Sequence, residues 1–123
     1  MFQLIESLSP NFIRFQPTGS TIREGHIVQL VTISDDIYVQ LSNGDRPFGF
    51  AGEIEDNWVK IYSQHMICRS DHFDKSISYK GGDRLYVKNG MLTTIKSDPN
   101  HLSVGNVISH VISNNSYLEL NWI

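Results

Sequence analysis

The sequence has few of the residues that would support a disulfide, a membrane span or a nucleic-acid surface. Cys68 is the single cysteine among 123 residues, so an intrachain disulfide is impossible and the fold needs no oxidising compartment. No apolar run approaches the roughly 18 residues of a membrane helix. The net charge of −3 and the scattered lysines and arginines argue against a phosphate-binding surface. We therefore expect neither nucleic acid nor a membrane among its partners.

Targeting and catalytic motifs are also missing. The first residues lack a basic segment followed by an apolar one, so we expect no signal peptide and synthesis in a cytoplasm. There is no Gly-x-Ser-x-Gly elbow, and no Gly-Lys-Ser/Thr follows Gly81-Gly82-Asp83. The paired carboxylates at Asp35-Asp36 and at Glu53-Glu55-Asp56 are interpreted as turn residues. We predict that the protein is not an enzyme and binds no cofactor.

One grouping has the residue types of a metal site. His65, Cys68 and His72 are spaced three and four apart. Structural zinc sites use four ligands, and no fourth ligand is evident from this spacing. Cys68 also follows two apolar residues, a context typical of a buried cysteine in a core. The sequence therefore predicts no metal site here.

Short β-strands account for most of the chain. Apolar and β-branched segments alternate with polar turns, of which Ser42-Asn43-Gly44-Asp45 and Lys88-Asn89-Gly90-Met91 have the Asn-Gly pair of tight turns. The spacing predicts eight to ten short strands about ten residues apart, with no amphipathic helix. The expected fold class is all-β, a small β-barrel or β-sandwich with an extended N-terminal arm.

Residues 1–25 differ from the remainder, which we expect to form the β-domain over residues 26–123. Turn-forming residues alternate there with large apolar ones. Such a segment either folds back on its own domain or lies along a partner. The candidate partner-binding residues are Phe2, Leu4, Ile5, Leu8, Phe12 and Phe15.

Aromatic side chains offer a second candidate surface. In extended strands, Trp58 and Tyr62 would share one face, as would Phe48 and Phe50. They either pack in the core or form an exposed ring surface for a protein or glycan partner.

The order of the motifs resembles a known family. Residues 82–87 (GDRLYV), 89–94 (NGMLTT) and 104–108 (VGNVI) are followed by a terminal strand around Leu118-Glu119-Leu120. Upstream, residues 45–51 (DRPFGFA) and 25–30 (GHIVQL) complete the series. This order over residues 24–123 resembles the small β-barrel head decoration (cement) proteins of tailed bacteriophages.

The resemblance implies a non-enzymatic virion protein on the capsid surface. Such proteins bind the major capsid protein on the outside of the head, often as trimers, and brace adjoining capsomers. An N-terminal arm often reaches onto the shell, a role that the apolar segment 1–25 would suit. The alternative is another virion component, such as a fibre, collar or baseplate protein, that binds protein or carbohydrate through exposed aromatics.

Overall fold

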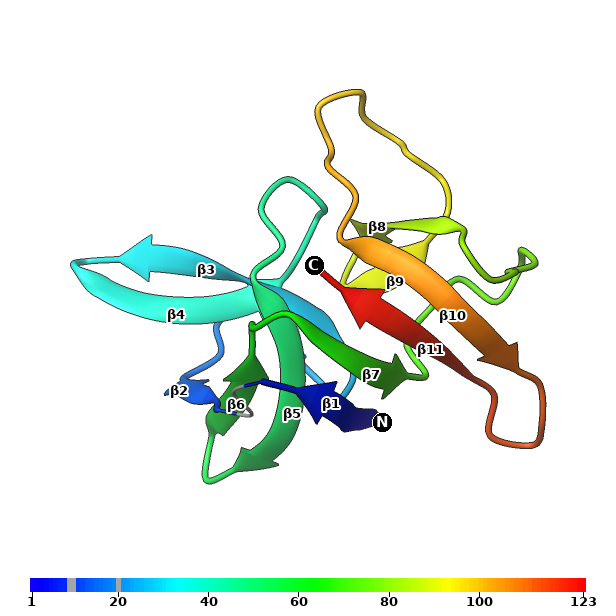
Figure 1. The fold of residues 1–123 in the computed structure, drawn as a ribbon. Coiled ribbons are helices and arrows are strands. Elements are labelled where there is room, and N and C mark those ends of the chain that lie inside the picture. Colours follow the sequence, from blue (N-terminus) through cyan, green and yellow to red (C-terminus); the bar gives the residue numbers. More distant parts are fainter. Residues whose placement is uncertain (9–10, 20) are drawn as a thin grey trace.

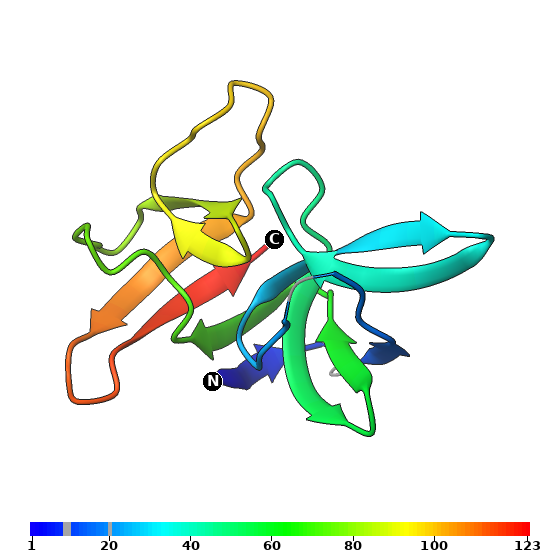
Figure 2. The same ribbon diagram turned by 180° about the vertical axis from the view of Figure 1, so that it is seen from behind.

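The computed structural model describes residues 1–8, 11–19 and 21–123, and it is all-β (Figures 1 and 2). In these residues the strands are β1 (Phe2–Ser7), β2 (Ile13–Phe15), β3 (Ile27–Ile33), β4 (Asp36–Leu41), β5 (Gly49–Glu55), β6 (Trp58–Tyr62), β7 (Met66–Ser70), β8 (Arg84–Lys88), β9 (Met91–Thr93), β10 (Gly105–Val111) and β11 (Tyr117–Trp122). The predicted fold class is confirmed. The described part of the chain contains no helix of the length and apolarity required to cross a bilayer.

The first sheet has six strands in the order β1-β7-β11-β10-β8-β9. Its centre is the antiparallel pair β7 and β11, in which Leu120 lies opposite Cys68 and Trp122 opposite Met66. These four side chains are buried, because alternate residues of both strands point to the same side. The strict alternation in β7 and β11 thus gives this sheet one apolar face.

The second sheet has five strands in the order β2-β6-β5-β3-β4 and curls toward a barrel. Residues just after β2 close it, because Pro17 forms a parallel bridge with Val39 of β4. Thr18 N donates to Val39 O, and Val39 N donates to Gln16 O. One continuous segment, β2 and its extension, therefore bonds to β6 on one side and to β4 on the other.

Each sheet covers its own apolar cluster, and β5 lies between them. Phe50 of β5 belongs to the larger cluster with Trp122, whereas its neighbour Ala51 belongs to the smaller one with Val59. The Phe50 ring meets Trp122 edge-on at 4.8 Å between centroids and stacks on Phe2 at 5.2 Å. Phe50 is thus the point at which β5 of the second sheet packs into the core of the first.

The N-terminal segment folds back on its own domain, which was one of the two alternatives. β1 pairs with β7 at the edge of the first sheet, and β2 pairs with β6 in the second. Residues 1–25 therefore contribute one strand to each sheet rather than projecting as a separate arm. Residues 9, 10 and 20 of this segment lie outside the described part.

Candidate functional site

The outer halves of β3 and β4 form a ribbon that projects from the rest of the fold (Figure 1) and carries exposed apolar side chains. β3 pairs with β5 only through Ile27 and Val28. The extension of β2 reaches β4 only around Val39. Among the described residues, residues 30–33 of β3 therefore pair only with residues 36–39 of β4, as a two-stranded ribbon whose outer edges are open apart from the contact at Val39.

Both faces of this ribbon carry apolar side chains. Leu30 lies opposite Val39 and Thr32 opposite Ile37, which places them on one face, while Ile33 points to the other. Leu30 is 38% exposed, Ile33 45% and Ile37 50%. A lone two-stranded ribbon is only marginally stable in water. Its exposed apolar side chains do not stabilise it, because their surface is not removed from water. This is the composition expected of an element that is covered in an assembly.

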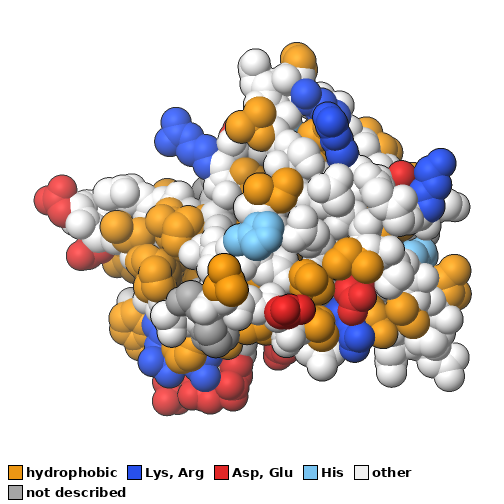
Figure 3. All heavy atoms as spheres, in the orientation of Figure 1, with side chains coloured by type: hydrophobic (Ala, Val, Ile, Leu, Met, Phe, Trp, Pro, Cys, Tyr) orange, Lys and Arg blue, Asp and Glu red, His pale blue; other side chains and the backbone are white. Residues whose placement is uncertain are grey.

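The ribbon has an acidic tip and a shallow groove at its base. Figure 3 shows hydrophobic side chains over the ribbon and acidic ones at its end. The tip turn has positive φ at Ser34 (50°) and Asp35 (71°), a conformation that short polar residues tolerate. The groove is lined by Leu30, Thr32, Ile37, Arg46, Pro47 and Phe48.

The six sequence-predicted partner residues divide into packed and exposed sets. Phe2 and Leu4 pack against the larger core, and Phe15 packs against the smaller one. The exposed set is Ile5 (40%), Leu8 (105%) and Phe12 (37%). Of the six, these three expose the most side-chain surface to a partner.

The open aromatic patch does not form. Tyr62 is half-buried because Phe2 stacks on it at 5.1 Å and Phe12 contacts it at 5.8 Å. Phe48 meets Phe15 edge-on at 6.4 Å and packs against the smaller core. Trp58 remains exposed, at 44%, without either of these rings beside it.

The three residues whose spacing was considered for a metal site, His65, Cys68 and His72, do not come together. His65 and His72 flank the opposite ends of β7, so a strand of roughly 3.3 Å per residue separates them. Cys68 lies between them in β7, fully buried, and this burial raises the pKa of its thiol. The core interpretation of Cys68 is confirmed.

His72 instead lies beside His26, with ring centroids 4.0 Å apart. Burial, and next the neighbouring His72, lower the pKa of His26 to about 4, and burial also lowers the pKa of His72. His72 Nδ1 approaches Asp71 Oδ1 to 2.8 Å but without hydrogen-bond geometry. His26 Nδ1 accepts the Arg23 N–H at 2.9 Å, so this pair is part of the packing around the turn before β3.

The carboxylate clusters do not resemble an acid–base pair in a cleft. Glu53 and Glu55 lie in β5, not in a turn, because β5 is longer than the sequence indicated. Their mutual hydrogen bond lowers the pKa of Glu53 and raises that of Glu55, and Lys60 lies 3.1 Å from Glu53. Both are exposed, so water is not excluded from them as catalysis of this kind requires.

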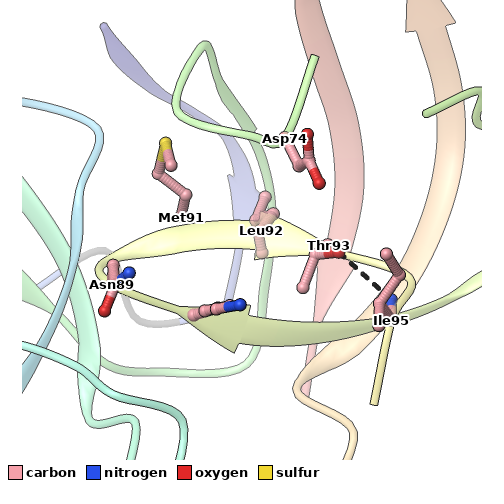
Figure 4. Close-up of a pocket in the computed structure, with 7 residues that line it drawn as sticks. Asp74, Asn89, Met91, Leu92, Thr93 and Ile95 are labelled. Atoms are coloured by element: carbon pink, nitrogen blue, oxygen red, sulfur yellow. Dashed lines mark hydrogen bonds between the residues drawn. The ribbon is translucent and has the colours of Figure 1, made fainter. Parts of the chain in front are cut away.

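A pocket beside the β8–β9 hairpin is small and lacks a nucleophile with a base. Figure 4 shows Asp74 facing β9 across it. The Asp74 carboxylate accepts hydrogen bonds from Ser76 N at 3.0 Å and Ser76 Oγ at 2.6 Å, which lower its pKa. Thr93 Oγ1 accepts the Ile95 N–H at 3.1 Å and is occupied in a local turn. The lining residues include no histidine, cysteine or serine.

The comparisons with known proteins add no family. No protein-family model matches the chain, and a search of curated proteins finds no match.

The exposure of the ribbon was not predicted from the sequence, because exposure depends on where neighbouring strands stop pairing. A signal was present: consecutive apolar residues at 30–31 and 37–39 mean that both faces of the hairpin are apolar.

Proposed function

We propose that the protein is a non-enzymatic virion structural protein, a capsid decoration (cement) protein that binds the outer surface of a tailed-phage head. The observation that carries the proposal is the β3–β4 ribbon, whose exposed apolar residues lie on both faces. The order of the strand motifs in residues 24–123, which resembles that of phage decoration proteins, supports this class of virion protein. The partner is the major capsid protein, and the protein associates with itself, as a trimer, on the capsid.

The physical logic of such a brace is avidity. A ribbon and a few exposed residues bury little area, so a single copy would bind weakly. Many copies related by symmetry, each joined to its neighbours, add their contacts and hold adjoining capsomers together. The exposed N-terminal residues Ile5, Leu8 and Phe12 would supply a second contact.

The test is binding of the purified protein to heads of the phage that encodes it. Light scattering gives the oligomeric state with and without heads, and co-sedimentation gives the affinity. The ribbon variant Ile33→Ser/Ile37→Ser should lose at least about tenfold in affinity, the loss expected for interface anchors. The control Leu102→Ser/Ile112→Ser alters side chains that are 81% and 79% exposed and should bind normally.

A protein that stays monomeric and never binds heads would refute the decoration role. Immunogold labelling at the collar, baseplate or fibres would place the protein in the alternative class. Equal binding by the ribbon variant and the control would refute the ribbon as the contact.

A further inference from the structure

Two loops, one from each sheet, meet at the same end of the molecule (Figure 1). The β4–β5 loop contributes Asp45, and the β9–β10 loop contributes Asp98 and His101. His101 Nε2 lies 2.9 Å from Asp45 Oδ1. One side-chain N or O atom from each of the three residues lies within 4.8 Å of the other two.

Local turns fix the backbone of both loops and the carboxylate of Asp98. In the first loop, Asp45 N donates to Asn43 Oδ1 at 2.9 Å. In the second loop, Asn100 N donates to Asp98 Oδ1 at 2.8 Å, and His101 N donates to Asp98 O at 3.0 Å. The cluster is therefore presented by two hydrogen-bonded turns rather than by free side chains.

His101 lies against the backbone of Gly44. Gly44 has φ +101°, and a Cβ there would lie 2.8 Å from the imidazole Cε1. Only glycine combines that backbone with room for the ring.

Apart from this clustering of side chains, the His101 side chain is buried. Its side chain is 8% exposed, and its Nδ1 is buried without a hydrogen-bond partner. One ring nitrogen thus lacks a hydrogen bond, while Nε2 lies 2.9 Å from Asp45 Oδ1 and the Asp98 carboxylate completes the cluster. Among the described residues, no lysine or arginine pairs with Asp45 or Asp98. Two carboxylates this close repel each other unless a cation lies between them.

The geometry and the ligand types point to a metal ion. Adjacent ligands of an ion with bonds of roughly 2.0–2.2 Å lie about 3 Å apart, close to the Nε2–Oδ1 separation. One imidazole nitrogen and two carboxylates suit first-row transition metals, whereas Ca²⁺ and Mg²⁺ favour oxygen ligands throughout. Asp45 is exposed, so water could complete the coordination from outside.

We propose that Asp45, Asp98 and His101 bind one divalent transition-metal ion, such as Zn²⁺ or Mn²⁺. The ion joins the β4–β5 loop of one sheet to the β9–β10 loop of the other. This site does not depend on the proposed capsid role.

The test is isothermal titration of the chelator-treated protein with Zn²⁺ and, separately, with Mn²⁺, Ca²⁺ and Mg²⁺. We expect one saturable Zn²⁺ or Mn²⁺ site per chain and much weaker Ca²⁺ and Mg²⁺ binding. Thermal unfolding at 100 times Kd should show Tm raised by roughly 10 °C. Asp45→Asn and Asp98→Asn should each weaken binding at least about tenfold.

Matched controls separate this site from adventitious surface binding. His65→Asn removes an exposed histidine, and Asp35→Asn removes an exposed carboxylate of the ribbon tip; both should bind zinc normally. His101→Asn should abolish binding, and the two aspartate variants keep the test valid if that buried substitution unfolds the protein. Absence of saturable binding, or unchanged affinity in both aspartate variants, would overturn the proposal.

Discussion

Replacing Phe50 with alanine should test whether the two sheets unfold as one unit. Phe50 is fully buried and its ring contacts Trp122 of the first sheet and Phe2 of β1. The side chain itself belongs to a strand of the second sheet. Its removal would leave a cavity at the junction of the two sheets.

The magnitude follows from the lost burial and the lost ring contacts. A buried Phe→Ala substitution costs about 3–5 kcal/mol, and each aromatic pair contributes about 0.5–1.5 kcal/mol of the interaction. A chain of this length has a free energy of unfolding of about 6–18 kcal/mol, so the variant should still fold. With an m-value of about 1.5–2 kcal/mol/M in urea, the midpoint should fall by about 2 M.

The assay is urea unfolding followed at two tryptophans. Trp58 lies in the second sheet and Trp122 in the first. Trp58→Phe leaves a reporter in the first sheet, and Trp122→Phe leaves one in the second. The substitution Phe50→Ala should lower the midpoint in both backgrounds by the same amount, because strands of both sheets share the core in which Phe50 packs.

The control is Phe12→Ala, which truncates a ring that is 37% exposed and should cost below about 1.5 kcal/mol. Two separate transitions at Trp58 and Trp122 would refute the single cooperative unit. A midpoint shift no larger than that of the control would refute the role of Phe50.

Three further predictions concern single groups. The pKa of His26 is lowered from 6.5 to about 4, so the unfolded chain binds the proton first and the free energy of unfolding should fall as the pH drops from about 6.5 to 4. After allowing for the partial exposure of His26, this loss is about 1 kcal/mol. The difference between the urea midpoints at pH 7 and pH 5 should therefore be smaller in His26→Gln than in the unsubstituted protein. Cys68 should resist a thiol reagent at pH 8 until denaturant is added, because burial raises its pKa; prompt labelling of the native protein would contradict this. Gly90 has positive φ and a Cβ there would crowd Leu41, whereas Gly82 has positive φ in open space. Gly90→Ala should therefore lower the free energy of urea unfolding by about 1–3 kcal/mol more than Gly82→Ala. Equal losses in the two variants would contradict the crowding at Gly90.

Strand existence and turn positions were predictable from the sequence because they depend on local chemistry. The Asn89-Gly90 turn and the β8–β9 hairpin follow from a dipeptide that tolerates positive φ, at 51° and 75° here. The length of β5 was not predictable, because Gly49 and Gly52 resemble turn residues. Their role is close packing: a Cβ at Gly52 would meet the Tyr62 ring.

The cluster at Asp45, Asp98 and His101 could not be found from spacing. Asp45 lies 56 residues before His101. Asp45 belongs to a loop of the second sheet, whereas Asp98 and His101 belong to a loop of the first. Contacts between the two sheets bring the loops together, among them the hydrogen bond that Gly90 N donates to Ser42 O at 2.7 Å. Sequence spacing can only group residues of one segment, such as His65, Cys68 and His72, for which the sequence predicts no metal site and which β7 holds apart.

The two strands of the N-terminal segment also decide how its partner contacts can be tested. Deleting residues 1–16 would remove β1 and β2, uncover Phe50 and Tyr62, and open the second sheet. Loss of head binding would then report unfolding rather than a lost contact. The decisive variant is Ile5→Ser/Leu8→Ser, whose side chains are exposed and whose stability should change by only about 0.5 kcal/mol per site. Weaker head binding with an unchanged urea midpoint would assign these residues to the interface; unchanged binding would leave the ribbon as the contact.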